Sequence, residues 1–215
     1  MNPGRVGLII AGSVAALVAC VGDLVMPLLL ARYYPGYNHL RDVESLLGAA
    51  DSPVARWMNL WWIGFGTLIM LFAAAFGLAF SDSGPAAVAL TGQLALFGVL
   101  AGVAAGIFPM DVGGQVTLSG RLHHLLAGAG FLAILLAPGT SMVLFRPGGH
   151  MTMFVIATVT QVGGLVTCVL FIACEGKTAG ALRFVGLWQR LFLLNCYVFV
   201  SALAIQTIHY VRTSP

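Results

Sequence analysis

Six long apolar blocks constrain this chain more than any other feature of its sequence. They cover approximately residues 7–30, 56–80, 86–108, 121–145, 151–174 and 187–210. Each block reaches the roughly 20 residues that a helix needs to cross the hydrocarbon of a bilayer. The blocks do not alternate apolar and polar residues, so we expect helices, which satisfy their own backbone hydrogen bonds in lipid, and not a β-barrel. The sequence predicts an all-α, polytopic bundle of six transmembrane helices in a single transmembrane domain over residues 1–215.

The composition agrees with a membrane protein and excludes several other classes. The chain is 60% hydrophobic and 8% charged, whereas a soluble domain carries about 25% charged residues. Its single lysine and the absence of a basic run speak against nucleic-acid binding. The four cysteines all lie inside apolar blocks without CxxC spacing, which speaks against a disulfide framework or a zinc site. We therefore expect no metal and no cofactor, and membrane lipids as partners.

The first apolar block is too long for the core of a signal peptide, and no clear cleavage site follows it. We expect it to be retained as a span. The expected location is the plasma (inner) membrane of a prokaryote, as a multi-pass protein.

Six spans place both ends of the chain on one side of the membrane, which we call side A. The connectors at 31–55, 109–120 and 175–186 then lie on the other side, side B. Seven of the ten Lys and Arg residues are at side B, and the positive-inside rule would place that side in the cytoplasm. If Arg32, Arg41 and Arg190 serve a site instead, the count becomes four against three, so the orientation stays open.

The first connector is unusually polar and has a pattern of its own. Tyr34-Pro35-Gly36-Tyr37 is typical of a turn. Apolar residues then recur at helical spacing, which predicts a short amphipathic helix over about 38–49 that lies along the membrane interface, with Asn38 as its cap. Its expected apolar residues are Leu40, Val43, Leu46 and Leu47, and its expected polar residues are Arg41, Asp42, Glu44 and Ser45.

Asp23 lies well inside a span, where no other acidic residue lies. A carboxylate at membrane depth is costly, so it favours a functional or a paired role. Pro27 follows one turn later, and its missing N–H frees a backbone carbonyl and kinks the helix. The alternative is that Asp23 stays protonated, or pairs with a nearby arginine, for structural reasons.

Two further polar groups are expected at the side-B rim. Asp111 follows the third block, and His123 and His124 open the fourth, so a carboxylate and an imidazole could form an acid–base pair there. Arg190 opens the sixth block, where its guanidinium could bind a phosphate or carboxylate, or extend to water.

Glycines spaced by four in the third block (Gly98, Gly102 and Gly106) predict a smooth ridge that packs closely against a neighbouring helix. We expect Gly128 and Gly130 to do the same in the fourth block.

Several short motifs, taken in order, resemble a family of bacterial and archaeal membrane proteins known as domain of unknown function 998. They cover nearly the whole chain and are Tyr37-Asn38-His39-Leu40-Arg41-Asp42, Ser45-Leu46, Ser52-Pro53, Met58-Asn59, Phe108-Pro109-x-Asp111, Gly120-x-x-His123 and Gly186-Leu187-Trp188-Gln189-Arg190. The resemblance implies a six-span helical protein and favours His123 over His124. It assigns no activity. Val43-Glu44-Ser45 stands where the resemblance leads us to expect isoleucine, serine and glutamate in that order.

The favoured hypothesis is a polar site on side B that binds, and could act on, a lipid headgroup or small amphiphile. Its catalytic candidates are Asp111 and His123, and its binding candidates are Asp23, Arg32, Tyr37, Asn38, Arg41, Asp42, Ser45, Asn59 and Arg190. A small transporter or permease component is the first alternative, with polar groups through the bundle at Asp23, Gln161, Asn195 and Gln206. A noncatalytic scaffold or assembly subunit that binds a partner protein is the second. A b-type haem protein, with ligands among His39, His150 and His209, is the most remote.

Overall fold

The computed structural model describes residues 2–114, 116–145, 151–174 and 183–213, and within them it forms a bundle of helices without strands. Six helices are long and apolar enough to cross a membrane, so the six predicted spans are confirmed. In chain order they are α1 (Pro3–Leu30), α2 (Ala55–Ala79), a composite third helix, α5 (Leu118–Phe145), α6 (Met151–Cys174) and α7 (Val185–Thr213). The third helix is built from α3 (Pro85–Leu96), η3 (Phe97–Ala104) and α4 (Ala105–Ile107). Arg146, His150 and Lys177 lie outside the described residues.

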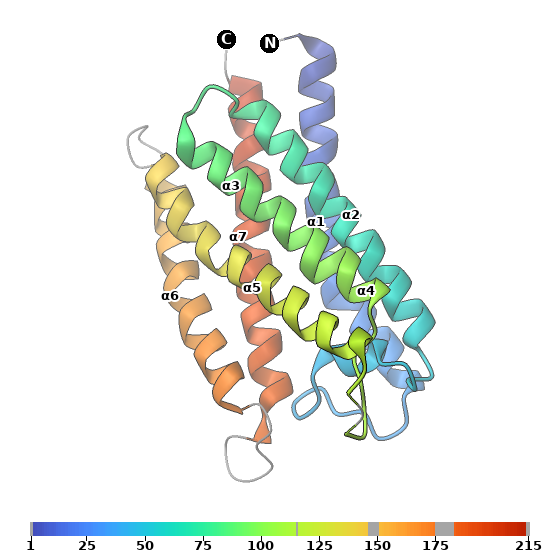
Figure 1. Ribbon diagram of the computed structural model, residues 1–215. Helices are drawn as coiled ribbons and strands as arrows, with labels where there is room; N and C mark the ends of the chain where they lie inside the picture. Colours follow the sequence, from blue (N-terminus) through green and yellow to red (C-terminus); the bar gives the residue numbers. More distant parts are fainter. Residues whose placement is uncertain (1, 115, 146–150, 175–182, 214–215) are drawn as a thin grey trace.

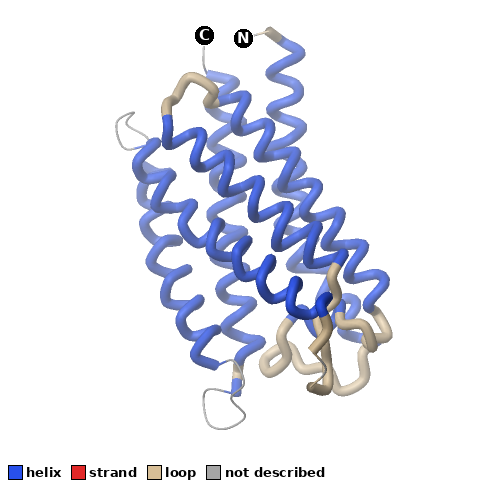
Figure 2. The backbone as a smooth tube through the Cα atoms, in the orientation of Figure 1, coloured by secondary structure: helices blue, strands red, loops and turns tan. Residues whose placement is uncertain are grey.

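Figure 1 shows both ends of the chain at the same end of the bundle, which is side A as predicted. The first connector and the loop between α4 and α5 lie together at the opposite end, side B, where Figure 2 draws most of the described loop structure. Side B is therefore the end at which two long connectors can meet.

Helix starts follow from local sequence. Asn2 accepts a hydrogen bond from the backbone N–H of Gly4 at 2.9 Å and caps α1, and Pro3 occupies the first turn, where no N–H is needed. Gly84 has φ 83°, a conformation that glycine adopts without strain, and it turns the chain into Pro85 at the start of α3.

The glycine ridge of the third helix packs against α2, as predicted. A Cβ on Gly102 would lie 2.5 Å from the Cα of Gly66, and one on Gly106 would lie 2.5 Å from the carbonyl oxygen of Asn59. This stretch includes the π-helix η3, whose wider turn accommodates the contact. Backbone contacts this close require glycine at both positions.

The two glycines of α5 differ from each other. A Cβ on Gly130 would lie 2.7 Å from the backbone nitrogen of Ala101, so Gly130 packs as predicted. A Cβ on Gly128 would meet nothing within 4 Å, so the prediction of close packing is wrong there.

The helix predicted over 38–49 is wrong in extent and in orientation. The first connector contains two 3₁₀ helices, η1 (Ala31–Tyr33) and η2 (Glu44–Gly48), and turns over 38–42. The carbonyls of His39, Leu40 and Asp42 accept hydrogen bonds from α7, so they are not available for a continuous helix. The predicted faces hold only in part: Leu47 is buried and Arg41 is exposed as expected, but Glu44 is 5% exposed and Leu40 is 47% exposed.

Candidate functional site

Asp23 is 4% exposed and joins three helices. One of its carboxyl oxygens accepts a hydrogen bond from the indole Nε1–H of Trp61 on α2 at 2.7 Å, and the other accepts from the hydroxyl of Tyr197 on α7. The structure thus gives Asp23 two neutral donors, where we had considered an arginine partner. A carboxylate has about four acceptor positions, so two are left open.

Glu44 enters the bundle from the first connector, and periodicity alone could not identify it. Its backbone N–H donates to Oε1 of Gln189 at 2.6 Å, a contact between residues 145 apart in sequence. Burial and the charge of Asp23 raise the pKa of the Glu44 carboxyl well above its usual value, against smaller lowering effects of Arg190 and Trp62. Two acidic side chains therefore lie inside side B, one predicted and one not.

His123 and Asp111 are both at side B, but each has a different partner. Nδ1–H of His123 donates to the carbonyl of Phe108 at 2.8 Å, because a carbonyl oxygen can only accept. When the ring is neutral, this fixes Nε2 as an acceptor. The carboxylate of Asp111 accepts from both the backbone N–H and the hydroxyl of Thr117, each at 2.7 Å, and these bonds lower its pKa. The expected acid–base pair is thus not present in the structure.

The backbone carbonyl of Phe108 takes the orienting role that we had assigned to Asp111. His123 is 4% exposed while His124 is exposed, so His123 is the histidine that faces the bundle.

Arg190 holds the first connector against α7. Its guanidinium donates to the carbonyls of His39 at 2.6 Å and Asp42 at 3.0 Å, and also to Gly186 and the hydroxyl of Tyr37. Burial raises the pKa of Tyr37, whose hydroxyl donates to the carbonyl of Val43. Both terminal nitrogens of Arg190 donate to the protein itself, so its position supports a structural role.

The other binding candidates have mostly local roles. The side chain of Asn38 accepts from Leu40 N–H at 2.9 Å, and that of Asp42 accepts from Asn38 N–H at 2.7 Å. Asn59 Nδ2 donates to the carbonyl of Gly48 at 3.0 Å. Arg32 and Arg41 are exposed, and Ser45 lines the cavities described next.

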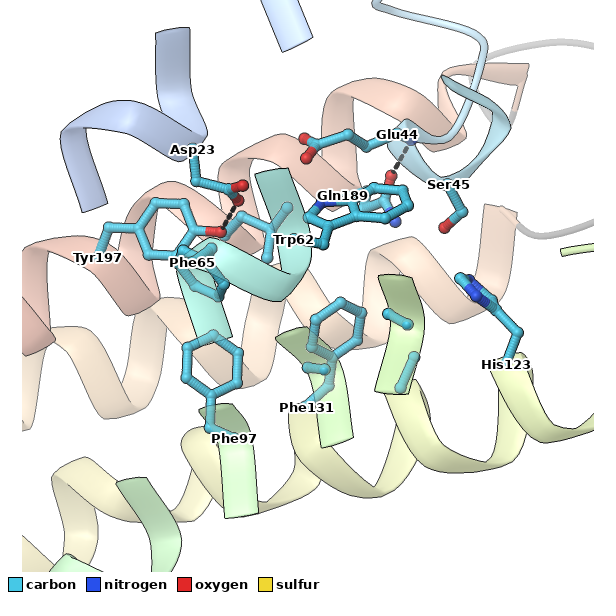
Figure 3. A pocket seen from close by; sticks show the side chains of 14 residues that line it. Asp23, Glu44, Ser45, Trp62, Phe65, Phe97, His123, Phe131, Gln189 and Tyr197 are labelled. Carbon is cyan, nitrogen blue, oxygen red and sulfur yellow. Dashed lines mark hydrogen bonds between the residues drawn. The ribbon is translucent and has the colours of Figure 1, made fainter. Parts of the chain in front are cut away.

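A small cavity, the inner chamber, brings the buried polar groups together. Its volume is about 30 Å³, and Figure 3 shows Asp23 and Tyr197 toward one end and Ser45 and His123 toward the other. Its polar lining consists of Asp23, Glu44, Ser45, His123, Gln189 and Tyr197, and its aromatic lining of Trp62, Phe65, Phe97 and Phe131. The chamber can hold a group about the size of one or two water molecules.

A much larger cavity, the outer pocket, lies between α5, α6 and α7 and has a volume of about 540 Å³. Its lining is mainly apolar and includes Leu132, Leu135, Phe171, Ile172 and Phe192. It shares five lining residues with the inner chamber, namely Ser45, His123, Ala127, Phe131 and Gln189. Gly128, whose missing side chain leaves open space, also lines it. The two cavities therefore meet where the polar lining begins.

A family model described as "Protein of unknown function (DUF998)" matches residues 10–206. The chain belongs to this family. Neither a curated protein nor a solved structure matches the chain. The resemblance drawn from the short motifs is thereby confirmed, and it places both cavities of this DUF998 protein inside the matched region.

Polar residues deeper in the DUF998 bundle connect helices to each other. Gln161 on α6 accepts from the N–H of Gly139 at 2.7 Å and donates to the carbonyl of Leu135 at 3.0 Å. Asn195 on α7 donates to the carbonyl of Thr160 at 2.7 Å. These contacts give both residues a packing role, whereas the transporter alternative needs them along a path.

The haem alternative requires two ligands close together. His39 contacts the start of α7 through its carbonyl, and His209 lies near the end of the same helix. At 1.5 Å per residue these two histidines of the DUF998 protein are about 30 Å apart. They do not form a bis-histidine pair.

Sequence reasoning missed Glu44 and Gln189 as members of one site. Gln189 stands inside the motif that resembles the family, next to Arg190, but the arginine drew the functional interpretation. The buried residue of the two is Gln189, at 3% exposed. In this DUF998 chain, the feature that could have identified the site is the amide of Gln189, which lines the same chamber as Asp23.

Proposed function

We propose that this protein binds an amphiphile, with the apolar part in the outer pocket and the polar end at the inner chamber. The observation that carries the proposal is the outer pocket itself. Its 540 Å³ falls within the roughly 300–1,000 Å³ of small-molecule sites, and such sites combine apolar walls with a few converging polar groups.

Unused hydrogen-bonding capacity at the junction of the two cavities supports the proposal. Gln189 is 3% exposed, and its Oε1 accepts from Glu44, but its Nε2 donates to no group among the described residues. Gln189 lines both cavities, so an acceptor on a bound molecule could take this hydrogen bond.

The open space beside Gly128 supports it from the apolar side. Protein interiors are close-packed. Elsewhere in this chain, a Cβ added to Gly12, Gly66 or Gly102 would lie within 3 Å of a neighbouring atom. The outer pocket is instead open to the surface, since its lining residues Gly128, Leu132 and Ile172 are exposed. An acyl or alkyl chain is the occupant that its leucine, isoleucine and phenylalanine lining fits best.

Filling the outer pocket tests the proposal. Gly128→Leu places a side chain in the pocket without a backbone clash, and Gly92→Leu is a matched control because Gly92 on α3 also has nothing within 4 Å and lines neither cavity. Each protein is purified in a mild detergent, and retained amphiphiles are extracted and identified by mass spectrometry.

We expect the wild type and Gly92→Leu to retain the same amphiphile in near-stoichiometric amount and Gly128→Leu to lose most of it. Equal retention by all three proteins, or by none, would contradict the proposal.

A further inference from the structure

The inner chamber is lined by two acidic side chains, Asp23 and Glu44, and by no lysine or arginine among the described residues. Arg190 lies close enough to Glu44 to lower its pKa and lines a neighbouring cavity of about 230 Å³ with both acids, but its terminal nitrogens donate to the first connector. Resting on the proposed function, we infer that the polar end of the bound amphiphile is a primary ammonium group, held in the inner chamber between Asp23 and Glu44. An anionic end group would meet two acidic side chains there.

The acceptor positions in the chamber suit a cation with several N–H donors. Asp23 keeps two acceptor positions after its bonds with Trp61 and Tyr197. An ammonium carries three donors in a compact group and can bond to two carboxylates at once. Burial raises the pKa of Glu44 well above its usual value, and an ammonium beside it would favour the ionised carboxylate.

The aromatic lining and the size of the chamber further restrict which polar end groups it can hold. Aromatic rings attract cations through their electron-rich faces, and Trp62, Phe65, Phe97 and Phe131 line the chamber. One water needs about 10–15 Å³, so the chamber's 30 Å³ admits an ammonium and excludes a trimethylammonium.

A second observation, independent of the acids, points to the same ligand geometry. The Nε2 donor of Gln189 has no partner among the described residues and lies where chamber and pocket meet. It can bond to an oxygen that follows the amine in a lipid headgroup. A long-chain amine and an amine-bearing headgroup share the ammonium chemistry, so the test separates them.

Two pairs of ligands that differ only in methylation of the amine provide the test. Dodecylamine is compared with dodecyltrimethylammonium, and lysophosphatidylethanolamine with lysophosphatidylcholine. Dissociation constants are measured by native mass spectrometry on the delipidated full chain. We expect at least one primary amine to bind tenfold or more tightly than its trimethylated counterpart, and the pair that shows it identifies a simple amine or a headgroup as the source.

If neither primary amine binds more tightly than its counterpart, the inference is overturned, while binding that Gly128→Leu abolishes would leave the proposed function standing. If no ligand binds in a way that Gly128→Leu weakens, the proposed function fails as well.

Substitutions of Asp23 and Glu44 test whether the preference for a primary amine arises in the inner chamber. Glu44→Gln keeps the backbone N–H that donates to Gln189, so the connector stays attached, and Asp23→Asn keeps one acceptor for its donors. Each is expected to reduce the preference for the primary amine at least tenfold. Asp51→Asn, at an exposed position of the same connector, is the control and is expected to leave the preference unchanged. An unchanged preference in both Glu44→Gln and Asp23→Asn would refute the assignment.

Discussion

Glycine occurs in two regions of the bundle with opposite effects on packing. One is the contact between α2 and the third helix, and the other is the cavity between α5, α6 and α7. In the first region glycine lets two backbones touch, since a Cβ on Gly66 would lie 2.3 Å from the carbonyl oxygen of Gly98. In the second, Gly128 faces open space. Small residues therefore do not by themselves identify a packing surface. The bundle packs closely in one region and leaves a pocket of about 540 Å³ in another.

The largest expected effect comes from adding a side chain in the packed region. Gly102→Leu would force a Cβ to within 2.5 Å of the Gly66 Cα and should destabilise the protein by about 3 kcal/mol or more, because the neighbouring backbone cannot move aside. Unfolding in one detergent, monitored by circular dichroism against Gly92→Leu, measures the effect. Equal unfolding midpoints for the two variants would mean that the contact is looser than described.

Removing the guanidinium of Arg190 should have the next largest effect. Arg190→Met leaves the carbonyls of His39 and Asp42 without their donor and should cost about 2–4 kcal/mol. It should also expose the first connector to protease. Arg190→Lys keeps the charge but loses the planar fork, so it should recover only part of the loss. Full protection of the connector in the Met variant would show that other contacts hold it.

Glu44 gives a pH dependence whose sign follows from burial. Its folded-state pKa is raised, so ionisation costs stability, and the wild type should lose stability as the pH rises above the usual glutamate value of 4.5 toward the folded-state value. Glu44→Gln imitates the protonated acid and should not show that loss. The groups around Glu44 that can carry charge are Asp23, Tyr37, His123, Arg190 and Tyr197.

Unfolding midpoints of wild type and Glu44→Gln at about pH 5 and about pH 8 give the measurement, with Asp51→Asn as the control. We expect the variant to gain on the wild type at the higher pH. A constant difference between them would mean that Glu44 does not titrate in this range.

The smallest expected effect on stability comes from Gly128→Leu. Because nothing lies within 4 Å of the added Cβ, the midpoint should stay within about 0.5 kcal/mol of the wild type. The same chemical change at Gly102 should therefore be disruptive and at Gly128 harmless. A large loss of stability at Gly128 would show that the outer pocket closes in the empty protein.

The sequence was sufficient to predict the six spans, because the length and hydrophobicity of each apolar block can be read without knowing which other block it contacts. It also located Asp23, since a carboxylate inside an apolar block is visible in one dimension. It failed at the first connector because the fold there depends on partners far along the chain. The bond between Glu44 and Gln189 joins residues 145 apart, and no local periodicity encodes it.

The rim residues show the same limit. Asp111 and His123 were correctly placed at one end, but the choice of hydrogen-bond partner is decided over a few ångströms. Gly120 illustrates this, because a Cβ there would lie 2.1 Å from the carboxylate of Asp111. That glycine lets Asp111 settle against the start of α5 and bond to Thr117, away from the imidazole.

The attachment of the first connector to α7 has a consequence for the order in which the protein assembles. The residues that hold the connector, from Gly186 to Arg190, are synthesised after the first five spans. Domains tend to fold as their segments emerge, yet this connector must wait for the sixth span before its carbonyls are satisfied. Until then the inner chamber has no Gln189 or Tyr197, and the backbone N–H of Glu44 lacks its acceptor. Insertion of the last helix is thus the step that completes the site, and a stall before it would leave an inserted protein without a chamber.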